Sequence, residues 1–229
     1  MKNNLSTILL VIVLGFCLIF IISNKNTHQV SEKALPTPEI TEGIRGEMFG
    51  IDKNINEETI DNYLGRADSV YRDMRMLKDP GNYEAIGGDS YLSGLVKGFE
   101  VVPYPLFTPV DGLPPEVGET YTGETLFSIG ENGEYTANYE ESLPFLEYYF
   151  PKDKNIFLMC GGGGYAGMTK KMLVSLGWDE SKIYNVGGYW SYTGENNVAI
   201  KNESNGKTVY DFWKVTYHAP DFNSLHKIK

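Results

Sequence analysis

A cysteine followed by four glycines is the part of this sequence whose residue types could do chemistry. Cys160 directly follows the apolar run Asn155–Met159, which predicts a buried strand. Beyond the glycines, apolar residues recur at helical spacing from Met168 to Leu176, and Gly177 ends the predicted helix. The sequence therefore places a thiol between the end of a strand and the start of a helix.

A thiol in this position would lie near backbone N–H groups and near the positive end of the helix dipole. Such surroundings lower the pKa of a cysteine and expose its sulfur. The glycines have no side chains to block the N–H groups and can take positive φ, so the loop can curl around an anion. We therefore expect Cys160 to be a nucleophile. The predicted substrate-binding loop consists of Gly161, Gly162, Gly163, Gly164, Tyr165 and Ala166.

Other motifs fit this loop less well. The glycines 162, 164 and 167 satisfy the dinucleotide fingerprint, but they come late in the chain rather than at its first strand–helix turn. Met168 stands where a phosphate-binding loop needs its lysine, and no arginine occurs after Arg75 to close a phosphatase loop. The remaining alternative is a buried cysteine beside a tight turn. Four successive glycines lose much chain entropy on folding, and this cost disfavours that alternative.

Four segments, in order, resemble the rhodanese-like family. The loop from Cys160 to Ala166 is similar to the family's active loop Cys-x-x-Gly-x-Arg followed by Ser or Ala. The segment 69–75 resembles the early strand that ends in Asp-x-Arg, and the segment 94–104 resembles Gly-His-Ile-Pro-Gly-Ala-x-Asn-Ile-Pro. The segment 183–190 resembles the closing strand with its glycine pair.

The resemblance implies a rhodanese-like sulfurtransferase without a cofactor. Cys160 would carry sulfane sulfur as a persulfide between a small sulfur-containing donor, such as thiosulfate, and a thiol acceptor. Two residues depart from the family's pattern, because Tyr165 replaces the loop arginine and Leu95 replaces the histidine. These departures favour the alternative of a catalytically silent, membrane-tethered binding module. Asp73 and Arg75 are expected to support the loops through an ion pair at a strand end.

Composition excludes some functions and supports a packed core. The chain of 229 residues has a net charge of −10, which disfavours nucleic acid as a partner. Its two cysteines and three histidines show no metal-ligand spacing, so no metal site is predicted. The 16 tyrosines, 11 phenylalanines and 3 tryptophans supply enough apolar surface for a sizeable core.

The N-terminus carries a predicted membrane anchor. Residues 5–23 contain no charge, and a stretch of this length can cross a bilayer as a helix. We expect an uncleaved single-pass anchor over residues 1–24 and a polar, proline-containing linker over residues 25–45. The following domain is expected to lie outside the cytoplasm.

Strands that alternate with helices predict an α/β fold, a rhodanese-like parallel sheet with helices on both faces. The domain is expected to span residues 46–229, with an insertion over 107–142 and a C-terminal extension over 191–229. Asn-Gly turns predict a β-hairpin in each of these additions. The second hairpin is expected to pair Val198–Ile200 with Thr208–Tyr217. A helix near Pro144 is expected to present Phe145, Tyr148 and Tyr149 on one face.

Overall fold

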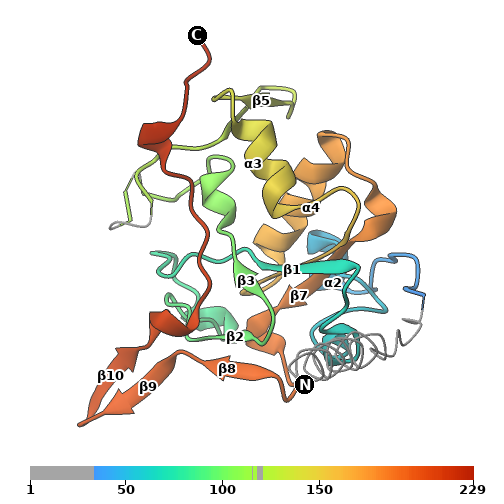
Figure 1. The fold of residues 1–229 in the computed structure, drawn as a ribbon. Helices are drawn as coiled ribbons and strands as arrows, with labels where there is room; N and C mark the ends of the chain where they lie inside the picture. The colour runs from blue at the N-terminus through green and yellow to red at the C-terminus, as the bar shows by residue number, and fades with distance from the viewer. Residues whose placement is uncertain (1–33, 115, 118–120) are drawn as a thin grey trace, which may run out of the picture. The chain divides into compact units, whose positions relative to one another are not determined.

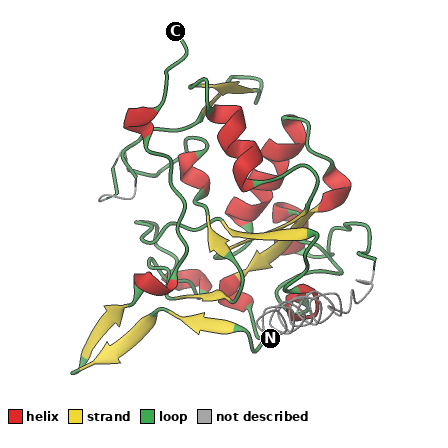
Figure 2. Cartoon of the chain, in the orientation of Figure 1, coloured by secondary structure: helices red, strands yellow, loops and turns green. Residues whose placement is uncertain are grey.

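A four-stranded sheet lies at the centre of the structure, a computed structural model that describes residues 34–114, 116–117 and 121–229 (Figures 1 and 2). Its strands are parallel and follow the order β3-β1-β6-β7. Their bounds are β1 (Ser69–Asp73), β3 (Glu100–Val101), β6 (Asn155–Cys160) and β7 (Ile183–Gly188). The predicted parallel α/β sheet is confirmed.

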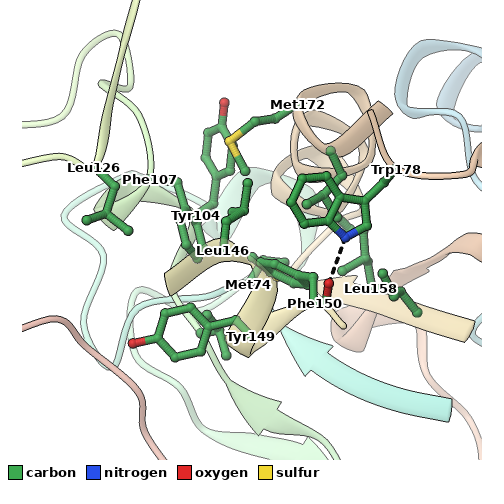
Figure 3. Close-up of a cluster of buried hydrophobic side chains, with 14 of the residues drawn as sticks. Met74, Tyr104, Phe107, Leu126, Leu146, Tyr149, Phe150, Leu158, Met172 and Trp178 are labelled. Atoms are coloured by element: carbon green, nitrogen blue, oxygen red, sulfur yellow. Dashed lines mark hydrogen bonds between the residues drawn. The ribbon is translucent and has the colours of Figure 1, made fainter. Parts of the chain in front are cut away.

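Helices α3 (Ser142–Tyr149) and α4 (Gly164–Ser175) cover one face of the sheet (Figure 1). Side chains alternate along a strand, so Ile156, Leu158 and Cys160 of β6 share the face that packs against these helices. Trp178 closes this core, and its indole N–H donates to the carbonyl oxygen of Phe150 at 2.6 Å (Figure 3). The buried cluster also includes Met74, Tyr104, Phe107, Leu126, Leu146, Tyr149 and Met172.

The opposite face of the sheet is aromatic. Phe157 of β6 stacks between Tyr71 of β1, at 5.1 Å, and Tyr184 of β7, at 5.0 Å. The hydroxyl groups of these two tyrosines donate to the backbone oxygens of Tyr63 and Pro36. The chain that precedes β1 therefore covers this face, and it includes the 3-10 helix η2 (Ile60–Tyr63). The sequence predicts helices on both faces of the sheet. Helices α3 and α4 cover one face, whereas a 3-10 helix and extended chain cover the other.

The segment 36–45 packs on the domain, although the sequence assigned it to the linker. The compact unit that contains the sheet begins at Pro36. Backbone hydrogen bonds from Thr41 to Ile51 and from Lys53 to Glu39 tie the segment down, and helix α2 (Ile44–Phe49) follows. The predicted domain start at residue 46 was therefore too late. The predicted anchor and residues 25–33 of the predicted linker lie outside the described residues. Among the described residues, no helix is long and apolar enough to cross a membrane.

The hairpin predicted in the insertion is confirmed, whereas the second hairpin is shorter than expected. Strands β4 (Phe127–Ile129) and β5 (Tyr135–Ala137) pair around the first Asn-Gly turn. The second turn joins β9 (Lys201–Ser204) to β10 (Lys207–Tyr210), and this hairpin extends away from the sheet (Figure 1).

Val198 and Ala199 do not join the second hairpin, because a partner elsewhere competes for them. Strand β8 (Asn197–Ala199) pairs with β2 (Gly94–Val96), which is far away in the sequence. After Tyr210 the chain turns into the 3-10 helix η8 (Phe212–Lys214). The predicted long strand Thr208–Tyr217 is therefore wrong beyond Tyr210.

The buried face of α3 also differs from the prediction. Leu146 is fully buried and Tyr149 is 4% exposed, but Tyr148 is 68% exposed. Phe145 packs at the edge of the core. The other described 3-10 helices are η3 (Glu84–Ile86), η4 (Tyr104–Leu106), η6 (Glu180–Lys182), η7 (Tyr189–Ser191) and η9 (Phe222–Ser224).

Candidate functional site

A cavity of about 480 Å³ lies where the carboxyl ends of β1, β6 and β7 meet. Ligands of open parallel sheets bind at this edge, and the volume lies within the range of small-molecule sites. Arg75 and Met76 line the cavity after β1, Gly161 and Gly162 after β6, and Trp190 after β7. None of the described lining residues belongs to the insertion 107–142, whose residues Phe107, Phe127 and Tyr139 instead pack into the core with α3.

Cys160 closes β6 directly before the glycine loop, as the sequence predicts, but its thiol is buried. The residue is 3% exposed and packs with the core beneath α3 and α4. Its sulfur accepts a hydrogen bond from the backbone N–H of Gly163 at 3.1 Å and a second from that of Ala166. Two N–H groups of the predicted loop therefore point at the sulfur.

Burial raises the pKa of the Cys160 thiol, and the negative charge of Asp73 raises it further. The N–H groups of Ala166 and Gly163 and the positive charge of Arg75 lower the pKa, but burial outweighs them. The predicted exposed thiol with a lowered pKa is therefore wrong. The reason is that β6 turns its last side chain toward the apolar core, where a thiolate is poorly solvated.

The glycine loop is shaped by the tryptophan that packs on it. A side chain at Gly161 would place its Cβ 2.4 Å from the Trp190 ring, so only glycine fits there. The backbone N–H of Trp190 also donates to the carbonyl oxygen of Gly161 at 3.1 Å. Gly163, which precedes α4, has φ +103°, a conformation that side chains rarely adopt. Close packing and one positive φ thus account for two of the four glycines.

Asp73 and Arg75 form the predicted ion pair, and Arg75 also reaches the cavity. The pair is bidentate, with Arg75 Nε at 2.9 Å from Asp73 Oδ1 and Nη2 at 2.5 Å from Oδ2. Nη2 also donates to the carbonyl oxygen of Gly94 at 2.7 Å, while the Tyr189 ring lies 4.4 Å from the guanidinium carbon. The remaining nitrogen, Nη1, is buried and has no hydrogen-bond partner among the described residues.

Tyr165 lines the cavity but does not act on the sulfur. Its hydroxyl donates to Asp79 Oδ2 at 3.0 Å, and its ring stacks on Tyr104 at 5.6 Å. Burial raises the pKa of the neighbouring Tyr83 to about 12, and the negative charge of Asp79 contributes. The Tyr165 hydroxyl is therefore engaged by Asp79 and not by the sulfur of Cys160. Arg75, from the adjacent strand, provides the positive charge near Cys160.

Several cavity residues were not predicted from the sequence. Trp190 lies just beyond the end of β7, at the sheet edge where Cys160 ends β6, and this position is a signal that could have found it. Ile44 and Met48 of α2 lie within or beside the predicted linker, and no local pattern marks them. In the part of the chain that the structure describes, no group of three or more His, Cys, Asp or Glu residues could hold a metal ion.

The arrangement combines a thiol, two N–H donors and a buried guanidinium beside an apolar cavity. Such a set can stabilise a negative charge on sulfur or on a ligand beside it. Comparisons with models of known families, with curated proteins and with solved structures gave no match to this chain. The function is therefore argued from the site and from the resemblance of its loop.

Proposed function

We propose that the chain is a rhodanese-like sulfurtransferase that carries sulfane sulfur as a persulfide on Cys160. The observation that carries the proposal is the position of the Cys160 sulfur. It receives the N–H groups of Gly163 and Ala166 at the start of α4 and lies within electrostatic reach of Arg75. A persulfide is anionic, and oriented N–H groups and a guanidinium stabilise such a charge.

The reaction is balanced by the donor and the acceptor alone. The Cys160 thiolate, after its proton has left to solvent, attacks the outer sulfur of thiosulfate. An S–S bond forms at Cys160 while the S–S bond of thiosulfate breaks, and the electron pair leaves with sulfite. An acceptor thiolate then attacks the outer sulfur of the persulfide and takes it away, which returns the Cys160 thiolate.

Mass spectrometry of the full-length chain after incubation with thiosulfate tests this proposal. We expect the peptide that contains Cys160 to gain the mass of one sulfur atom and to lose it when a thiol acceptor is added. Cys17→Ser should gain sulfur as the wild type does, and Cys160→Ser should gain none. Absence of the gain in the wild type, or an equal gain in Cys160→Ser, would refute the proposal.

A binding module without turnover is the second candidate, and one observation favours it. Cys160 is 3% exposed, and burial raises the pKa of its thiol, so most of it is protonated at neutral pH. In that case the cavity would bind ligands while Cys160 stayed inert. The two candidates differ in the thiosulfate experiment, because only the sulfurtransferase acquires sulfur.

We further propose that residues 1–24 anchor the domain to a membrane, with the domain outside the cytoplasm. The uncharged stretch 5–23 supports this proposal. Because Cys160 is buried, a cysteine introduced at an exposed position is a better site for labelling. In a chain that carries Cys17→Ser and Cys160→Ser, an impermeant maleimide should label Glu131→Cys in intact cells. Labelling that needs cell lysis would place the domain in the cytoplasm.

A further inference from the structure

The mouth of the cavity beside the Cys160 loop is apolar. Three large side chains that line the cavity are exposed: Ile44 is 82% exposed, Met48 67% and Ile86 69%. They come from α2 and from η3, two elements that are separate in the sequence. Exposed apolar residues that gather at a cavity mark a binding surface, because their contact with water is unfavourable until a partner covers them.

Arg75 lines the cavity and is paired with Asp73, but one N–H group of its guanidinium has no partner among the described residues. Among the charged residues that line it, Asp79 and Asp89 each accept hydrogen bonds within the domain, and Arg45 pairs with Glu57. Arg75 is 6% exposed, and its Nη1 has no partner among the described residues. A buried guanidinium N–H without a partner is costly, and an anionic acceptor offsets that cost best.

We infer that this cavity binds a small organic anion with an apolar body. The anionic group accepts from Arg75 Nη1, and the body packs between the ring of Trp190 and the apolar side chains at the mouth. The ring of Tyr83, whose centroid lies 5.0 Å from that of Trp190, extends the aromatic wall. A cavity of about 480 Å³ suits an aryl or branched alkyl group, whereas thiosulfate would leave most of it unfilled.

Binding of inert analogues tests the cavity without any sulfur chemistry. Titration calorimetry on the full-length chain should show that benzenesulfonate binds at least roughly tenfold tighter than methanesulfonate, because a buried phenyl ring contributes more than 1.4 kcal/mol. It should exceed neutral benzenesulfonamide by a similar factor. Equal affinity for the two sulfonates would refute the apolar body, and equal affinity for the sulfonamide would refute the role of Arg75.

A matched pair of exposed isoleucines locates the binding. Ile86→Ser should weaken benzenesulfonate binding about threefold to tenfold. Ile129→Ser, at a 43% exposed position on β4 that does not line the cavity, should leave the affinity unchanged. Equal effects of the two substitutions would place the ligand elsewhere and overturn the inference.

The two proposals fail in different experiments. If benzenesulfonate does not bind while thiosulfate still adds sulfur to Cys160, the inference is wrong and the sulfurtransferase stands. If benzenesulfonate binds as expected while thiosulfate adds no sulfur to Cys160, the cavity's ligand class stands and the sulfurtransferase is wrong.

Discussion

Cys160 and Arg75 meet at the same edge of the sheet because Cys160 ends β6 and Arg75 lies just beyond the end of the neighbouring parallel strand β1. Each is held by groups from its own strand end, the sulfur by Gly163 and the guanidinium by Asp73. Burial has opposite effects on the two. It raises the pKa of the thiol, which stays protonated, and it lowers the pKa of the guanidinium. The ion pair with Asp73 outweighs the effect of burial on Arg75 and keeps the guanidinium charged. The site therefore keeps its positive charge in place before any anion forms on sulfur.

The protonation of Cys160 predicts how sulfur uptake depends on pH. Because burial raises the pKa of this thiol, the reactive thiolate is scarce near neutral pH. We expect the initial rate of persulfide formation from thiosulfate to keep rising through pH of about 8.5, the pKa of an ordinary thiol. Rates measured from neutral to alkaline pH check this. A rate that levels off near neutrality would show that the thiol is activated and contradict the expectation.

The packing of Trp190 on the glycine loop predicts different outcomes for two adjacent glycines. At Gly161 an added Cβ would lie 2.4 Å from the Trp190 ring, so Gly161→Ala should lower the free energy of unfolding by about 1–3 kcal/mol. At Gly162 the added Cβ would lie 3.6 Å from the same ring, an ordinary contact. Gly162→Ala should therefore cost less than about 0.5 kcal/mol. Urea denaturation compares the two, and equal losses would contradict this account.

At the scale of elements, helix α3 shows which face of a short helix carries the stability. Leu146 is fully buried in the core, whereas Tyr148 is 68% exposed. We expect Leu146→Ala to lower the free energy of unfolding by about 2–5 kcal/mol. Tyr148→Ala should change it by less than about 0.5 kcal/mol. Denaturant unfolding of both variants tests the assignment, and a larger loss at Tyr148 would restore the face expected from the sequence.

Elements set by neighbouring residues could be predicted, and those set by distant contacts could not. The strand, glycine loop and helix around Cys160 follow from adjacent residues, as does the hairpin β4–β5. The burial of the thiol depends on α3 and α4 packing on the sheet. The pairing of β8 with β2 depends on strands far apart in the chain. The position of α2 at the cavity likewise depends on non-local contacts, such as that between the Asn185 amide and the Phe49 carbonyl.

At the scale of the whole molecule, buried tyrosines link stability to alkaline pH. Burial raises the pKa of Tyr104, Tyr149 and Tyr184 from 10.0 to about 12. The folded state therefore holds these protons more tightly than the unfolded state does. Their contribution to stability is complete below pH 10 and is lost as pH rises toward about 12. Urea midpoints measured across this range should fall steadily, and a constant midpoint would contradict the prediction.

The buried pair of Asp73 and Arg75 also affects how fast an anion can arrive. Beyond a few ångströms the two charges cancel, so an approaching ligand meets the field of the whole chain, whose net charge is −10. That field repels anions, and added salt screens it within a Debye length of about 8 Å at physiological ionic strength. Stopped-flow mixing with benzenesulfonate should therefore show an association rate that increases with salt, opposite to the usual behaviour of electrostatically steered ligands. A rate that falls with salt would indicate local attraction strong enough to overcome the net charge.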